Sequence, residues 1–391
     1  MPIAIVFLLL TFVENNWKER YFLLKDRGWL GFSIVMLLFY LMYVTGTLYS
    51  ENVGSAFSEW EYKIWLLVTP LALLPLLARI DNRQKDLLLL CFVLSVELVA
   101  VMCIVQSVIR FVITDNMSAF FYMDAGNLPL NSFQHPSYFS MYETICLAIS
   151  IEFMRKKNVW MENKWLRYLL MTSFAVFPLH IFLLQSKMAA LIFCILLLFY
   201  VIFLLNARRR RPILTIIILL ITGISFVLAI THLNTRISMS KQIYEQSSKS
   251  NPVESTSIRF ALWECGWEAY QEHLVFGVGP GDVLSTLHDK EVEHGYYYLS
   301  QHKHNCHSQY LQNMVALGIP GLLILLAFLG WPTVLAWRNK DLLTLIVVFI
   351  IGCNMLVDCV LQFYPGSTLS PIFLALCLSK EQTMPYGESW V

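Results

Sequence analysis

Residues 87–113 read LLLLCFVLSVELVAVMCIVQSVIRFVI and contain two charged side chains, Glu97 and Arg110. A helix needs about 20 largely apolar residues to cross the roughly 30 Å hydrocarbon core of a bilayer. This stretch is long enough to do so, and it therefore predicts a transmembrane helix.

Similar apolar runs recur along the chain. They lie near 28–49, 63–80, 138–154, 166–185, 188–206, 212–231, 314–336, 341–360 and 366–380. The run 2–13 is short for a span, but it lacks the basic start and cleavage site of a signal peptide, so we count it as a first span. The sequence predicts an all-α integral membrane protein: a polytopic bundle of about 11 transmembrane helices with one long, partly helical loop.

The composition supports this class. The 391 residues are 57% hydrophobic and 14% charged, whereas about a quarter of the residues of a soluble domain are charged. Lys and Arg (28) nearly balance Asp and Glu (27), so no basic field indicates a nucleic-acid partner. A soluble enzyme, a DNA-binding protein and a disulfide scaffold all fit poorly, and membrane lipids are the expected surroundings.

The short loops predict the orientation. One set of alternate loops and the C-terminal tail hold 19 Lys and Arg residues, and the other set holds three, Lys63, Arg110 and Lys187. Because basic loops stay in the cytoplasm, the C-terminus is expected to be cytoplasmic. Segment 232–313 is then a long loop on the outer face, between a bundle at 1–231 and C-terminal helices at 314–391.

This long loop holds seven of the nine histidines, which suggests that any chemistry takes place on the outer face. It also holds Cys265 and Cys306, which can form a disulfide in an oxidising compartment if their Cα atoms come within about 7 Å. A zinc site formed by Cys306, His304 and His307 is a further alternative, although the paired ligand spacing of structural zinc motifs is absent.

Two stretches of the loop have a pattern that suits an anionic ligand or a tight turn. A helix is expected from Ser257, with Arg259 in its first turn and Trp263, Trp267 and Tyr270 on the same face. Arginine near a helix start suits phosphate, but an amphipathic helix lying on the membrane fits the pattern equally. The following GVGPGD, residues 277–282, is a glycine-rich turn rather than a dinucleotide fingerprint, because Pro280 and the absence of a preceding strand argue against one.

The loop ends in HKHNCHSQYLQ, residues 302–312, directly before a span. His304 and His307 would share a helix face if that turn were helical. A neutral histidine is a natural general base near pH 7, and the membrane surface suits a lipid-borne donor. A solvated, histidine-rich loop end is the alternative interpretation.

Taken in order, these motifs resemble the O-antigen ligase and polymerase family of bacterial membrane glycosyltransferases. SIR at 257–259 with Trp263, and HLVFGVG at 273–279, are similar to the family's Arg-x-x-x-Trp helix and Gly-x-Gly turn. NCHSQYLQ at 305–312 with LGIPG at 317–321 resembles its His-Asn-x-x-Leu and Gly-Ile-x-Gly signature, and QSK at 185–187 resembles a Ser-Arg turn. Two residues depart from the pattern: Lys187 replaces the usual arginine, and Ser308 replaces the asparagine that commonly follows the histidine.

The resemblance implies a reaction in the bacterial inner membrane, with the active-site loop in the periplasm. The donor would be a glycan on undecaprenyl pyrophosphate, and the acceptor would be a hydroxyl of lipid A core or of another glycan. His307 would be the general base, with His304 in reserve, and Arg259 and Lys187 would neutralise the pyrophosphate. Ser308, Trp263, Gly277, Gly279 and Asp282 would support the site, and no metal or cofactor is expected.

Three functions remain open from the sequence. An O-antigen ligase-like transferase is favoured, and a repeat-unit polymerase would use the same donor with a second lipid-linked glycan as acceptor. A polysaccharide transporter or flippase would instead concentrate functional charges at mid-membrane. Glu97, Glu143 and Asp358 lie in or near apolar segments, where we expect mainly structural hydrogen bonds, and His180 is expected to be a packing residue. The oligomeric state is not indicated.

Overall fold

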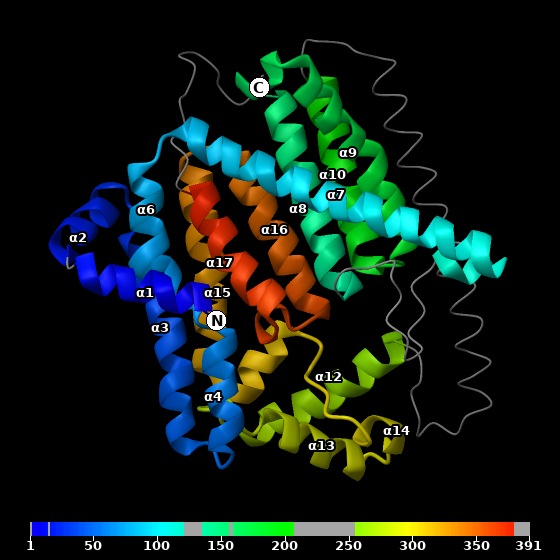
Figure 1. Cartoon of the computed structure of the whole chain (residues 1–391). Coiled ribbons are helices and arrows are strands. Elements are labelled where there is room, and N and C mark those ends of the chain that lie inside the picture. The colour runs from blue at the N-terminus through cyan, green and yellow to red at the C-terminus, as the bar shows by residue number, and fades with distance from the viewer. Residues whose placement is uncertain (1, 15, 121–134, 156–158, 207–254, 379–391) are drawn as a thin grey trace. The chain divides into compact units, whose positions relative to one another are not determined.

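The computed structural model describes residues 2–14, 16–120, 135–155, 159–206 and 255–378, and every regular element in this part of the chain is helical (Figure 1). The chain divides into two compact units. The first comprises 1–82 and 239–381, and the second comprises 83–238 and 382–391. The predicted helical fold class is therefore confirmed, while the predicted division by membrane side stays a prediction.

The first unit contains both the N-terminal and the C-terminal helices. Its long elements are α1 (Pro2–Glu14), α2 (Trp17–Asp26), α3 (Leu30–Gly46), α4 (Val53–Tyr62), α12 (Ser255–Glu272), α13 (Val283–Glu293), α15 (Gln309–Arg338), α16 (Leu342–Val357) and α17 (Tyr364–Leu378). Its short elements are α5 (Trp65–Val68), the π-helical turn η2 (Thr69–Leu73), α6 (Leu74–Arg79), α14 (Tyr297–Ser300) and the 3₁₀ turns η1 (Thr47–Tyr49) and η5 (Val360–Gln362).

The second unit is built mainly from four helices. They are α7 (Asn82–Thr114, which begins at the last residue of the first unit), α8 (Pro136–Arg155), α9 (Lys164–Leu183) and α10 (Lys187–Asn206). Helix α9 begins where the Asn163 side chain accepts a hydrogen bond from the Trp165 amide (2.9 Å), as is usual for an N-cap. Inside the unit, His180 Nδ1 lies 2.6 Å from Glu143 Oε1, and the Thr172 hydroxyl donates to Glu97 (2.6 Å). These contacts agree with the structural roles expected for Glu97, Glu143 and His180.

Four described helices are long and apolar enough to cross a membrane: Leu30–Tyr49, Asn82–Thr114, Lys164–Leu183 and Gln309–Arg338. Val53–Tyr62 and Trp65–Arg79 together form a fifth candidate, bent by 47°. Shorter apolar helices occur at Pro2–Glu14, Lys187–Leu198, Leu342–Val357 and Tyr364–Leu378, and the expected span 212–231 lies outside the described residues. A membrane protein is supported, whereas the count of about 11 spans is not confirmed.

Helix α15 is the central element of the first unit, packed against α3 and α16 (Figure 1). Phe328 of α15 stacks on Phe32 of α3, with ring centroids 5.9 Å apart. The helix is broken at Gly318, whose φ of +65° is not helical. The turn after α12 contacts α15 beside this break: the Val278 amide donates to the Val315 carbonyl (2.8 Å), and the Ile319 amide donates to the Leu274 carbonyl (2.9 Å).

Gly277 permits this close contact. Its φ is +71°, and a Cβ added there would lie 2.5 Å from the Val315 carbonyl oxygen and from the Ala316 carbonyl carbon. Backbone atoms cannot move away as a flexible side chain can, so the turn requires glycine at this position.

Gly277→Ala is therefore expected to destabilise the first unit by about 1–3 kcal/mol or more, because it adds left-handed backbone strain to a steric clash. The midpoint of thermal unfolding in detergent measures the effect. Gly330→Ala is the matched control, because a Cβ at Gly330 meets no atom within 4 Å. Equal midpoints for the two variants would contradict this explanation.

Candidate active site

Three segments of the first unit that are distant in sequence meet at one place. They are α12, the stretch 301–308 that precedes α15, and the junction between α16 and η5. His307 Nδ1 lies 3.9 Å from Asp358 Oδ1, and Arg259 Nε donates to the carbonyl oxygen of Val357, next to Asp358 (3.0 Å). Trp263 Nε1 donates to the His307 carbonyl oxygen (3.3 Å). The structure thus brings together Arg259, Trp263 and His307, as the motifs predicted.

His307 is held in an unusual backbone conformation. Its φ is +45°, in the left-handed region that few residues other than glycine adopt. The conformation is fixed on both sides, because the His307 amide donates to Asn305 Oδ1 (3.0 Å) and its carbonyl accepts from Trp263. The imidazole is 26% exposed, so a solvent-borne hydroxyl can reach it. Strain of this kind points to a functional position.

Asp358, for which the sequence indicated mainly a structural hydrogen bond, is a further member of the candidate site. Its side chain is 5% exposed, Oδ1 accepts from the Cys359 amide (2.9 Å), and Oδ2 is buried with no hydrogen-bond partner among the described residues. A carboxylate beside an imidazole holds the ring in place and stabilises its protonated form. The 3.9 Å separation is longer than a hydrogen bond, but catalytic contacts are often long without substrate.

The sequence signal for a functional Asp358 is its charge at the end of an apolar run. Placing a charge in an apolar segment costs free energy, and charged residues found there are often functional. The sequence did not reveal its partner, since 51 positions separate it from His307.

The helix predicted from Ser257 is confirmed as α12, although it begins at Ser255, two residues earlier. Arg259 therefore lies just beyond the first turn. Of the predicted aromatic face, Trp263 is half-buried and Tyr270 is buried, whereas Trp267 is exposed. The face thus packs partly inside the unit, and its contact with His307 through Trp263 links it directly to the candidate site.

His304 and His307 do not share a helix face, because α15 begins only at Gln309 and no helix covers 303–306. Their rings are nevertheless neighbours, with centroids 6.5 Å apart, and His302 lies 6.2 Å from His304 in the same way. Burial, together with the nearby His302, lowers the pKa of His304 from its ordinary value. His304 is therefore neutral at pH 7 and able to accept a proton, which keeps it as the reserve base.

The first turns of α15 tie the two halves of the site together. Gln312 Oε1 accepts from the Cys306 amide (3.1 Å), just before His307, and lies 3.9 Å from the Cys359 thiol, just after Asp358. Gln309 Oε1 accepts from the Leu361 amide (2.7 Å). These amide side chains therefore fix the spacing between the His307 and Asp358 segments, although the sequence indicated no role for them.

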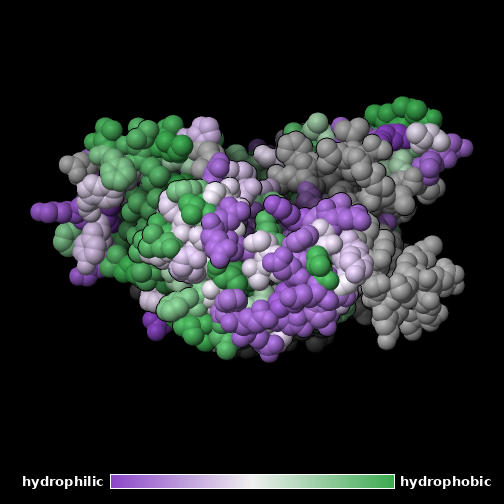
Figure 2. All heavy atoms as spheres, turned by 90° about the horizontal axis from the view of Figure 1, so that it is seen from below, coloured by the Kyte–Doolittle hydropathy of each residue, from purple (hydrophilic) through white to green (hydrophobic). Residues whose placement is uncertain are grey.

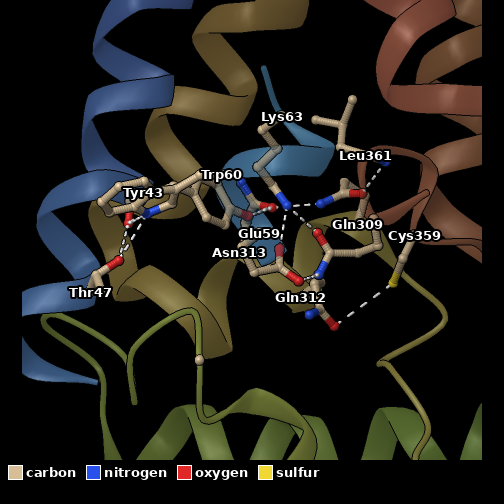
Figure 3. A network of polar contacts seen from close by, with 12 residues as sticks. Tyr43, Thr47, Glu59, Trp60, Lys63, Gln309, Gln312, Asn313, Cys359 and Leu361 are labelled. Atoms are coloured by element: carbon tan, nitrogen blue, oxygen red, sulfur yellow. Dashed lines mark hydrogen bonds and ion pairs between the residues drawn. The ribbon is translucent and has the colours of Figure 1, made fainter. Parts of the chain in front are cut away.

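The same polar network continues to a fully buried lysine. Lys63, at the break between α4 and α5, contacts the Glu59 carboxylate and Gln362 Oε1, and its ammonium lies 4.1 Å from the Tyr43 ring centroid. Figure 3 shows the Lys63 ammonium within the network, next to the Glu59 carboxylate. The sequence placed Lys63 among loop cations, but its exposed fraction is 0%. Its neighbours explain the difference: a carboxylate and amides replace water around the ammonium.

The supporting residues have different local roles. Asp282 Oδ1 and Oδ2 accept from the backbone amides of Asn52 (2.8 Å) and Glu51 (2.7 Å), so Asp282 fixes the link between α3 and α4. Gly279, at φ +101°, lies against Ser50 of the same link. Ser308 is the buried N-cap residue of α15, but its side chain makes no capping hydrogen bond. These residues shape the scaffold around the site.

Lys187 belongs to the second unit, where it is the exposed first residue of α10. The turn expected at 185–187 is confirmed between α9 and α10: Gln185 has φ +56°, and the Ser186 hydroxyl accepts from Ser140 (2.9 Å). The predicted contact of Lys187 with a pyrophosphate stays a prediction.

The two loop cysteines are free thiols in the structure, and both are buried. Burial and a nearby carboxylate, Glu291, raise the pKa of Cys265 to about 12, and burial raises that of Cys306 further. Both are therefore protonated near neutral pH. The suggested ligands Cys306, His304 and His307 are not grouped as a metal site in the described part of the chain.

Comparison with known proteins supports the resemblance found in the sequence. Residues 171–326 match the family model described as O-antigen ligase. The match contains Lys187, Arg259 and His307, and it ends before Asp358. No curated protein matches the chain at a significant level.

Proposed function

We propose that this protein, whose residues 171–326 match the O-antigen ligase family model, moves a glycan from undecaprenyl pyrophosphate to an acceptor hydroxyl on the periplasmic face of the bacterial inner membrane. This match implies a ligase-type or polymerase-type membrane glycosyltransferase. The observation that supports a transfer site is the meeting of Arg259, His307 and Asp358 from three separate segments.

The proposed chemistry uses these three side chains directly. Asp358 orients His307, and the other imidazole nitrogen takes the proton from the acceptor hydroxyl. The hydroxyl oxygen forms a bond to the anomeric carbon as the bond from that carbon to the pyrophosphate oxygen breaks, which inverts the configuration. The electron pair leaves with the pyrophosphate, whose added charge is stabilised by Arg259. Lys187 stays the proposed second cation.

The surroundings of Arg259 suit this role. Its Nε donates to the Val357 carbonyl, which fixes the guanidinium beside the His307–Asp358 pair. An arginine held in this way presents a planar fork that matches phosphate oxygens, whereas a lysine offers a single compact charge. Pyrophosphate is a good leaving group when its charge is neutralised, so the two cations can serve the reaction without a metal ion or a cofactor.

Arg259→Ala is expected to lower kcat/KM for the lipid-linked donor by about 10- to 100-fold, since a hydrogen bond to a charged group contributes about 1.5–3 kcal/mol. Arg259→Lys should recover part of this loss. The measurement is glycan transfer by the purified protein in detergent, with the donor concentration varied. Arg338→Ala, at the exposed end of α15, is the matched control. A donor kcat/KM that Arg259→Ala leaves unchanged would overturn the proposed role of Arg259.

The acceptor distinguishes the two activities of the family. Offered lipid A core together with the donor, a ligase transfers the glycan to the core. A polymerase instead lengthens the glycan on a second undecaprenyl pyrophosphate. We favour the ligase, and chain growth on the lipid carrier in this assay would assign the protein to the polymerases.

A further inference from the structure

A second candidate site lies close to the candidate active site in the first unit. It is a pocket of about 270 Å³ between the start of α4, helix α13 and the stretch after α14. This volume is just below the range of about 300–1,000 Å³ that is usual for drug-sized ligands. A single sugar ring is therefore a better fit than an oligosaccharide.

The lining of the pocket is suited to a hydroxyl-rich ligand. It includes Asn52, Ser55, His288, Gln301, His302 and Lys303. Amide, hydroxyl and imidazole groups both donate and accept hydrogen bonds, as sugar hydroxyls require. Figure 2 shows the face of the molecule on which α13 and α14 lie, and hydrophilic side chains gather in its centre.

The charge of the lining is one-sided. Lys303 is the charged residue among the described residues that line it, and no carboxylate is among them. The carboxylate of the neighbouring Asp282 is directed at the link between α3 and α4, where each of its oxygens accepts a hydrogen bond from a backbone amide. A cationic pocket of this kind favours an anionic ligand over a neutral one.

The pocket is connected to His307 along one short segment. His302 lines the pocket, its ring is 6.2 Å from that of His304, and the His304 ring is 6.5 Å from that of His307. A glycan whose reacting end lies at His307 therefore has this pocket within reach of a nearby sugar.

Building on the proposed function, we propose that this pocket binds an anionic sugar, carboxylated or phosphorylated, of the glycan that reacts at His307. Lys303 supplies the charge that selects it. Both the donor and the acceptor glycan can carry such a sugar, and the experiment below distinguishes the two.

The first test is direct binding to the purified full-length protein in detergent. Saturation-transfer NMR with glucuronic acid, glucose 6-phosphate and glucose is expected to show both anionic sugars binding at least about 10-fold more tightly than glucose. Lys303→Gln should weaken the anionic sugars about 5- to 10-fold and leave glucose unchanged. Lys290→Gln is the control. Lys290 lies on α13 outside the pocket and is paired with Glu272 and Glu293, so this substitution removes the same charge away from the proposed site. Equal binding of the three sugars, or no effect of Lys303→Gln, would overturn the proposal.

Two further measurements separate this proposal from the proposed function. His307→Ala should strongly lower the rate of transfer but leave sugar binding intact, so the binding result stands or fails independently of catalysis. In the transfer assay, Lys303→Gln should raise KM for the acceptor if the anionic sugar belongs to the acceptor, and KM for the donor if it belongs to the donor. Unchanged KM values for both substrates would contradict a role of the pocket in the reaction.

Discussion

His307→Ala is expected to lower the rate of glycan transfer by about 10²–10⁴-fold, the contribution typical of a positioned general base. The reason is its geometry: the imidazole is partly exposed to solvent, its residue is held in a left-handed backbone conformation, and Nδ1 lies 3.9 Å from Asp358 Oδ1. The measurement is kcat at saturating donor and acceptor. Because the base acts in the chemical step, kcat should fall while KM for the donor changes little.

His273→Ala is a suitable control, because His273 is an exposed histidine in the turn after α12 and is not one of the three proposed catalytic-site residues, Arg259, His307 and Asp358. Full activity of His307→Ala, with loss of activity in His304→Ala, would transfer the role of base to His304. That outcome would also remove the proposed function of Asp358.

Lys63→Met is expected to destabilise the first unit by about 3–5 kcal/mol, because it leaves the Glu59 carboxylate without its buried cation. Removing one partner of a buried pair is costly, whereas replacing both by uncharged groups is tolerated much better. The double variant Lys63→Met, Glu59→Gln should therefore be clearly more stable than Lys63→Met alone.

The midpoint of thermal unfolding in detergent measures this order of stabilities. The same variants should lose transfer activity in parallel, because Lys63 reaches the Asp358 segment through Gln362. A Lys63→Met protein as stable as the wild type would show that the network in Figure 3 contributes nothing to the fold.

The sequence predicted the local features of this protein better than its long-range contacts. Apolar runs indicated the helices, and the spacing of Arg259 and Trp263 indicated α12, because both signals lie within a few turns of chain. The sequence also predicted the glycine-rich turn. The structure shows why glycine is needed there, because the backbone at Gly277 and Gly279 closely approaches other atoms.

Asp358 and Lys63 show what local patterns cannot reveal. Asp358 is a charged residue at the end of an apolar run, and Lys63 is one between two apolar runs. Tertiary packing determines which residues surround each of them. Lys63 pairs with a residue four positions away but is buried by Gln362, 299 positions further on. The burial of a charge depends on such distant neighbours. Counting Lys and Arg in loops therefore placed Lys63 among the loop cations, although it lies inside the fold.

The most direct test of the central claim is a complete reaction with purified components. The full-length protein, an undecaprenyl-pyrophosphate glycan labelled on the sugar, and lipid A core are incubated with and without a metal chelator. The account predicts glycan transfer to the core, release of one undecaprenyl pyrophosphate for each glycan transferred, and the same rate in the presence of chelator. Absence of transfer to any hydroxyl acceptor, or release of the lipid carrier without transfer, would contradict the assignment of Arg259, His307 and Asp358 to a glycan-transfer site.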